Sequence, residues 1–213
     1  MKWTHLLNKW VIGATLLLGA LLMYMASQMP LNYWHHSKFS FGVDFVFNDF
    51  FPLIKIFGSF LSETDNTPIT ELNYKVYNYI SSTFLTIALW VIMAFAKEKG
   101  KSQGLLVVLI LIISQLNFLW LGATALSLSI SILGTTLLFV AYSKNQSQII
   151  PFALLSFFGM LFLLGSSLLG WLSIPVFLLI YVQNKKKLIT FLAAVVLATL
   201  VIYLADNLLW LNI

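Results

Sequence analysis

The chain contains no cysteine and no arginine. Without cysteine there can be no disulfide, no thiolate nucleophile and no cysteine-ligated metal. Without arginine there is no bidentate clamp for a phosphate or a carboxylate. All twelve basic residues are lysines on short, scattered segments that form no continuous basic face. Nucleic acid is therefore not an expected partner.

Motifs of membrane enzymes are missing as well. The sequence has no His-Glu-x-x-His, no Gly-x-Ser-x-Gly and no glycine-rich phosphate loop. No two carboxylates fall in opposing apolar segments, as an intramembrane aspartyl site would need. The acids outside these segments could act on a lipid-linked substrate, but no basic residue stands beside them to hold its phosphate. His35 and His36 have no third ligand at metal-binding spacing. We expect no enzyme activity, no metal and no cofactor.

Long apolar intervals are the main positive feature. Ser102–Ser143 and Asn145–Asn184 contain no charged residue, and each is long enough for two membrane crossings of about 20 residues. Val76–Ala96 and Leu188–Ala205 each suffice for one. With 60% hydrophobic and 9% charged residues, the chain could not bury its apolar surface as a water-soluble fold. The sequence predicts an all-α, polytopic helix bundle, with residues 1–213 forming one integral membrane domain.

The distribution of lysine predicts the topology. With the N-terminus in the cytoplasm and the C-terminus outside, nine of the twelve lysines fall on the cytoplasmic side and five of the seven acids fall outside. This follows the positive-inside rule. Six of the seven tryptophans then lie at a predicted membrane interface, and only Trp90 lies within a span. The seven expected spans are residues 10–29, 76–96, 104–121, 124–142, 149–165, 168–183 and 188–208.

Two parts of this topology have alternatives. The turn within 149–184 falls either at Gly165-Ser166-Ser167 or at Gly170-Trp171, and the later turn would leave a short re-entrant helix that contains Pro175. The first segment could be a signal peptide cleaved near Ala26-Ser27, which would leave six spans. Its apolar run is longer than a usual signal-peptide core, so we expect an uncleaved anchor.

Residues 30–75 form the one long extracytoplasmic loop, and phenylalanine is concentrated in it. The polar residues between Asp44 and Ser62 gather on one helical face, which predicts an amphipathic interfacial helix over about 49–61. Alternation of phenylalanine over 39–47 would instead suit a short strand. We interpret the apolar side chains as a docking surface for a partner, or else as a lid over the bundle. The residues proposed for docking are Phe47, Phe50, Ile54 and Phe57.

Two groups of polar residues are candidate sites within the membrane. Asp206 is the only acid inside an expected span, and Tyr203 lies one helical turn before it, so the pair is a candidate ion or proton site. The position of Asp206, far along its helix from Lys187, also fits the outer headgroup region. The second group is a polar cluster that consists of Ser114, Gln115 and Asn117. We interpret it as forming hydrogen bonds between helices, or else as lining a solute path.

Small residues recur at helical spacing and predict close helix packing or oligomer contacts. They are Ser127, Ser131 and Thr135 in one span, Ala194 and Ala198 in the last, and Gly159 and Gly165 in the fifth.

These features favour a non-catalytic accessory or interaction subunit of a membrane transport or secretion assembly, or an immunity-type protein. A self-contained small-solute carrier or channel coupled through Asp206 is the alternative. The expected contacts are bilayer lipid and a protein partner or a second copy of the chain. The exclusive use of lysine is typical of AT-rich bacterial genomes, so we expect a multi-pass protein of a bacterial plasma membrane.

Overall fold

The computed structural model describes residues 7–28, 71–114, 126–144, 148–166 and 168–210, and these are helical apart from short turns. The all-α prediction is confirmed for these ranges, which contain no strand. The six helices are α2 (Lys9–Gln28), α5 (Glu71–Ser114), α7 (Leu126–Tyr142), α8 (Ile149–Ser166), α9 (Leu168–Tyr181) and α10 (Lys185–Trp210).

Four helical stretches in the described residues are long and apolar enough to cross a membrane. They are Lys9–Gln28, Asn78–Gly100, Ile149–Ser166 and Lys185–Ala205. Leu128–Tyr142 and Trp171–Tyr181 are also apolar, but shorter. The chain thus has the make-up of a membrane protein. The expected span at 104–121 begins within α5 and continues outside the described residues.

The turn between the fifth and sixth expected spans lies between Ser166, where α8 ends, and Leu168, where α9 begins. The first of the two predicted positions is therefore confirmed. Pro175 lies inside α9 without ending it. At 1.5 Å per residue, the 14 residues of α9 reach about 21 Å, which is less than the thickness of a hydrocarbon core.

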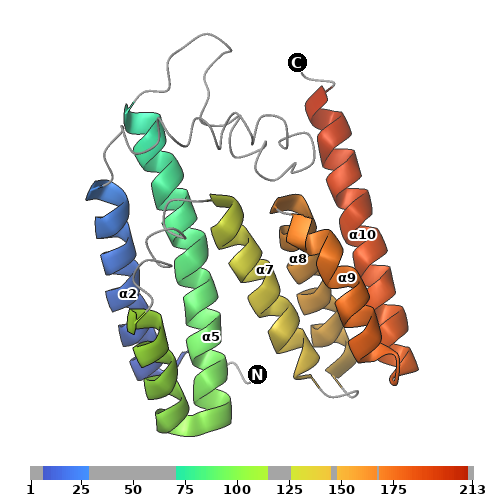
Figure 1. Ribbon diagram of the computed structural model, residues 1–213, viewed down its shortest axis with the longest axis horizontal. Coiled ribbons are helices and arrows are strands. Elements are labelled where there is room, and N and C mark those ends of the chain that lie inside the picture. The colour runs from blue at the N-terminus through green and yellow to red at the C-terminus, as the bar shows by residue number, and fades with distance from the viewer. Residues whose placement is uncertain (1–6, 29–70, 115–125, 145–147, 167, 211–213) are drawn as a thin grey trace.

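The helices run up and down along a common direction (Figure 1). The starts of α2, α8 and α10 and the ends of α7 and α9 lie at one end of the molecule, the lower end in Figure 1. The ribbon of α5 descends to this end and then turns back on itself. We call this end the lysine end, because Lys9 begins α2, Lys185 begins α10 and Lys144 follows the end of α7.

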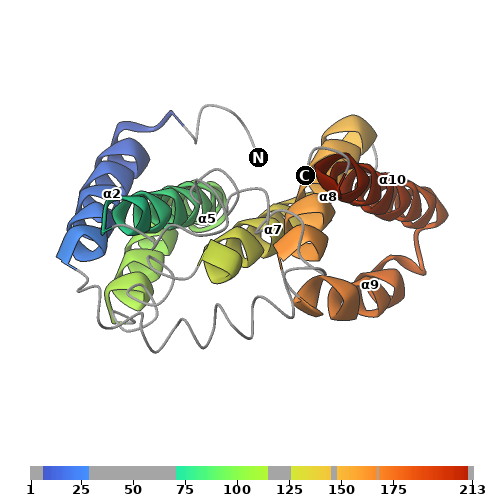
Figure 2. The same ribbon diagram turned by 90° about the horizontal axis from the view of Figure 1, so that it is seen from above.

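The described helices pack as two groups. One apolar cluster joins α2 and α5 around Leu22 and Leu85, and a second joins α7, α8, α9 and α10 around Met160 and Phe191. Viewed from above, α7 lies between α5 and α8, while α9 lies to one side of the row (Figure 2). Helix α7 therefore connects the two groups.

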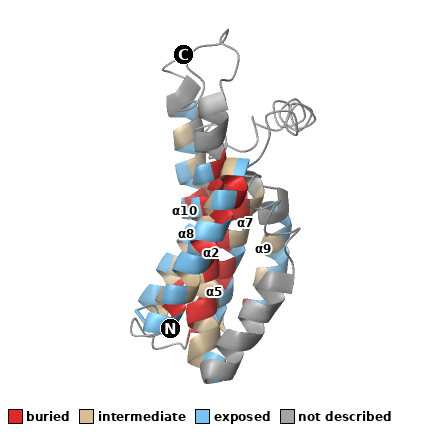
Figure 3. Ribbon diagram, turned by 90° about the vertical axis from the view of Figure 1, so that its left-hand side faces the viewer, coloured by how far each residue is buried: buried red, intermediate tan, exposed pale blue. Residues whose placement is uncertain are grey.

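Burial is greatest where helices face each other, and apolar side chains are exposed on the outside (Figure 3). In α10 these exposed side chains include Ile189, Leu192, Val196, Leu197, Leu200, Val201 and Leu204. Such a surface is expected of a helix that faces lipid rather than water.

Helices α7 and α8 approach closely at two glycines. A methyl group on Gly134 would come within 2.8 Å of the Gly159 carbonyl oxygen and 2.9 Å of Leu163 Cγ. One on Gly159 would come within 2.8 Å of Leu138 Cγ. Small residues at such crossings let backbones pack tightly in lipid. The packing role predicted for Gly159 is confirmed.

We predict that Gly134→Ala and Gly159→Ala each destabilise the protein by about 1–3 kcal/mol, because the added methyl group must displace backbone or a branched side chain. Thermal unfolding in detergent, followed by tryptophan fluorescence, would measure this. Gly13→Ala is the control: Gly13 also lies within a helix, but nothing lies within 4 Å of the added methyl group. Equal stability of all three variants would contradict the close approach.

Candidate functional site

Buried serines join α5, α7 and α8. Ser81 of α5 donates a hydrogen bond from its Oγ to Ser129 of α7, at 3.1 Å. The Oγ atoms of Ser131 in α7 and Ser166 in α8 lie 3.0 Å apart and are also hydrogen-bonded. All four side chains are buried. We call this set, Ser81, Ser129, Ser131 and Ser166, the serine seam.

Polar groups also join α2 to α5. Asn78 Nδ2 donates to the Ala26 carbonyl oxygen and Ser82 Oγ donates to the Leu22 carbonyl oxygen, each at 3.4 Å. Both side chains are fully buried. These bonds are long and therefore weak, and Asn78 Oδ1 has no hydrogen-bond partner among the described residues. The two bonds join α5 to α2 at two points one helical turn apart.

The register of each helix pair follows from these contacts. Between α7 and α8, Leu138 meets Gly159, Gly134 meets Leu163 and Ser131 meets Ser166, so each step back along α7 matches an equal step forward along α8. That is one antiparallel register held over about two turns.

The pair α5 and α7 differs, because it runs parallel. Ser81 bonds Ser129 near one end, and the rings of Phe95 and Phe139 pack edge to face at 5.4 Å nearer the other end. Both helices therefore advance in the same direction between these two contacts.

Other hydroxyl groups bond back to their own helix. The Thr86 hydroxyl donates to the Ser82 carbonyl at 2.7 Å, and the Thr135 hydroxyl to the Ser131 carbonyl at 2.8 Å. Thr136 and Thr199 donate in the same way to Ile132 and Val195. In lipid, such bonds satisfy a hydroxyl that water cannot reach.

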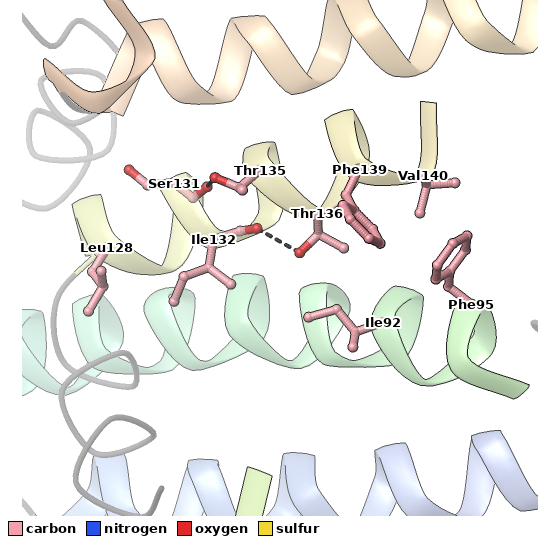
Figure 4. Close-up of a pocket in the computed structure, with 9 residues that line it drawn as sticks. All are labelled: Ile92, Phe95, Leu128, Ser131, Ile132, Thr135, Thr136, Phe139 and Val140. Atoms are coloured by element: carbon pink, nitrogen blue, oxygen red, sulfur yellow. Dashed lines mark hydrogen bonds between the residues drawn. The ribbon is translucent and has the colours of Figure 1, made fainter. Parts of the chain in front are cut away.

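A pocket of about 410 Å³ lies between α5 and α7 (Figure 4). Thr135 and Phe139 are exposed, so the pocket opens on the outer surface of the bundle. Its lining is mostly aliphatic and aromatic, consisting of Ile92, Phe95, Leu128, Ser131, Ile132, Thr135, Thr136, Phe139 and Val140.

Lys187 holds the lysine end of the second helix group together. Its ammonium donates to the carbonyl oxygens of Lys144 and, at 3.4 Å, of Tyr142, just where α7 ends. A cation is favourable at a helix C-terminus, where carbonyls lack helical partners. The same ammonium lies 5.4 Å from the centre of the Phe152 ring. Asn184 Oδ1 accepts from the Lys187 backbone N–H at 3.2 Å and caps α10.

Lys144 is almost fully buried beside this cap, and the loss of hydration lowers the pKa of its ammonium.

An aromatic cluster lies where α8, α9 and α10 meet. Tyr181 packs against Phe152, Phe177 and Phe191, with ring centres 5.3 to 6.1 Å apart. The Tyr181 hydroxyl is buried, and no residue in the described part of the chain forms a hydrogen bond with it. This aromatic cluster stabilises the α8–α9–α10 packing.

Most of the predicted site residues fall where side chains are not described. Asp206 lies in α10 and Ser114 ends α5, but neither side chain is described. Tyr203 is 64% exposed and lies on the outer surface of α10. The remaining candidates lie outside the described residues, and they are Gln115, Asn117, Phe47, Phe50, Ile54 and Phe57. The alternative strand at 39–47 and the interfacial helix at 49–61 also lie there.

Asn78, Ser81 and Ser82 are packing residues that were not predicted from the sequence. Their spacing of three and four places them on one helical face, and this pattern within an apolar span was the available signal. Within the described residues, no three histidine, aspartate or glutamate side chains are grouped so as to hold a metal ion.

No protein family, curated protein or solved structure matches this chain.

We predict that Ser81 and Ser129 are energetically coupled. A double-mutant cycle with Ser81→Ala, Ser129→Ala and the double variant should give a coupling of about 0.5–1 kcal/mol, typical of interhelical hydrogen bonds in membranes. Reversible unfolding in mixed micelles would supply the free energies. The matched cycle pairs Ser81→Ala with Thr199→Ala, whose hydroxyl bonds its own helix, and should give none. Zero coupling in both cycles would count against the serine seam.

Proposed function

We propose that this chain is a non-catalytic, polytopic membrane protein that acts as an accessory or interaction subunit of a transport or secretion assembly, or as an immunity-type protein. The observation that carries the proposal is the use of buried polar groups. Ser81, Ser129, Ser131 and Ser166 join helices to one another, and threonine hydroxyls bond their own backbone. These groups build a scaffold.

A small-solute path would need polar groups that remain available to the solute. In the pocket between α5 and α7, the hydroxyl protons of Thr135 and Thr136 are already donated to helix carbonyls. Ser131 is bonded to Ser166. The pocket thus has few hydroxyl protons left to donate to an anion or to another solute that must accept hydrogen bonds. This supports an interaction role over a carrier role.

We also propose seven crossings with the N-terminus inside and the C-terminus outside. The parallel course of α5 and α7 supports this, because the chain between them must cross back, as expected for a span at 104–121. The lysine end gathers Lys9, Lys144 and Lys185 on one side, which supports a cytoplasmic position for that end.

The absence of native cysteine allows a direct topology test. On intact cells, a membrane-impermeant thiol reagent should label Thr64→Cys in the outer loop and leave Ser143→Cys unlabelled until the cells are opened. Ser143 follows the end of α7 at the lysine end. Labelling of Ser143→Cys on intact cells, without labelling of Thr64→Cys, would reverse the proposed orientation.

For the partner, we propose docking through the apolar side chains of the outer loop, Phe47, Phe50, Ile54 and Phe57. Phe50→Ala combined with Phe57→Ala should reduce recovery of the partner severalfold in a gentle-detergent affinity purification from the native host, because buried aromatic anchors dominate interfaces. Expression of the chain should not change. Mass spectrometry of the co-purified proteins provides the readout.

The matched control is Phe158→Ala combined with Leu154→Ala, which removes exposed apolar side chains from α8 instead. Partner recovery should then match that of the parent. Recovery of the chain alone, together with loss of ion-dependent solute uptake in Asp206→Asn, would contradict the proposal and favour a carrier.

A further inference from the structure

The pocket between α5 and α7 and the ammonium of Lys99 form the two parts of a lipid site. We propose that this site binds one anionic phospholipid, with an acyl chain in the pocket and the phosphate at Lys99. The inference concerns a ligand of the bilayer and does not depend on the proposed accessory function.

The pocket suits a hydrocarbon chain. At about 410 Å³ it falls within the range of about 300–1,000 Å³ typical of small-ligand sites. Ile92, Phe95, Ile132 and Phe139 supply most of its apolar wall (Figure 4). The site lies between the candidate span of α5 and the shorter apolar helix α7, so in a bilayer lipid rather than water would surround it.

Hydrogen bonding within the pocket leaves few donors for a polar ligand that must accept hydrogen bonds, such as an anionic headgroup. The Thr136 hydroxyl donates to the Ile132 carbonyl at 2.7 Å, and the Thr135 hydroxyl donates to the Ser131 carbonyl at 2.8 Å. A polar ligand that needs donors would lose its hydrogen bonds to water and find few replacements. A methylene chain forms no hydrogen bonds with water, so it loses none when it enters the pocket.

Positive charge lies beside Phe95, one of the residues that line the pocket. The Lys99 ammonium is 5.8 Å from the centre of the Phe95 ring, and this ring in turn packs edge to face on Phe139. Both phenylalanines line the pocket, and Phe139 and Lys99 are exposed. An accessible cation therefore lies beside one of the rings that line the pocket.

The depth of Lys99 matches that of a headgroup. Lys99 is the penultimate residue of the candidate span Asn78–Gly100, so its side chain extends to the membrane interface while Ile92 lies two turns deeper. Residues 97–101 of α5 include three lysines and Glu98, which give this segment a net charge of +2. An anionic phosphate is attracted to such a segment, whereas a zwitterionic headgroup gains less.

Native mass spectrometry of the full chain in detergent, titrated with phosphatidylglycerol or phosphatidylcholine, tests the site. The parent should bind one phosphatidylglycerol more tightly than phosphatidylcholine. Lys99→Gln should weaken phosphatidylglycerol about fivefold, because a lysine near the interface contributes about 1 kcal/mol to binding an anionic lipid. Thr135→Trp, which fills the pocket from an exposed position, should weaken both lipids.

Two matched controls separate this site from general lipid adhesion. Lys9 also lies 5.8 Å from an aromatic ring, that of Trp10, but borders no described pocket, so Lys9→Gln should bind like the parent. Leu154→Trp adds the same bulk to an exposed position of α8 and should also bind like the parent.

Equal binding of the two lipids by the parent, with no effect of Lys99→Gln, would overturn the assignment of the phosphate. Unchanged binding by Thr135→Trp would overturn the assignment of the acyl chain. A dimer that forms as the lipid count falls would show that a second copy occupies the pocket, and it too would overturn the proposal.

Discussion

The close contact between α7 and α8 at Gly134 and Gly159 is the constraint on which the rest of the structure depends. In lipid, the surroundings of a helix are as apolar as the helix itself, so association relies on close packing and on hydrogen bonds between helices. The two glycines supply the close packing. They hold one antiparallel register, which places Ser131 opposite Ser166 and leaves the other face of α7 for α5. Any residue larger than glycine would separate the backbones and lengthen that hydrogen bond.

From this contact, α7 links the two helix groups. Asn78 and Ser82 of α5 donate long hydrogen bonds to backbone carbonyls of α2. Ser81 of α5 donates a hydrogen bond to Ser129 of α7 and so joins this pair to α7. The group of α8, α9 and α10 is closed at the lysine end by Lys187, which caps α7 across a gap of more than forty residues in sequence. The Lys187 ammonium at the lysine end and the buried serine hydroxyls between helices thus both satisfy polar groups where helices meet. We favour an interaction role because these polar groups form hydrogen bonds to one another or to the helix backbone.

The fold was predictable where a strong one-dimensional signal exists. Charge-free runs bounded by lysine located the apolar stretches of α2, α5, α8 and α10, and the Gly165-Ser166-Ser167 turn was one of two alternatives. The polar contacts were less predictable. Ser131 and Gly159 were predicted to be small packing residues. Their contact residues depend on the register between α7 and α8, which could not be predicted from one sequence. The pairing of Ser81 with Ser129 needs the parallel course of α5 and α7. Asp206 was predicted as a candidate site because charged residues are rare in membrane spans. That signal identifies the residue but does not predict which residues lie next to it.

The central claim is that α5 and α7 lie against each other in parallel through the serine seam, and oxidative cross-linking tests it most directly. Ser81→Cys and Ser129→Cys would be introduced together into this cysteine-free chain, with a protease site placed between α5 and α7. Because the two hydroxyl oxygens lie 3.1 Å apart, mild oxidation in native membranes should join the fragments by a reducible bond. The pair Thr83→Cys and Ser129→Cys should stay separate, because Thr83 is exposed and bonds its own helix. Failure of the first pair to cross-link, or equal cross-linking of both, would contradict the account.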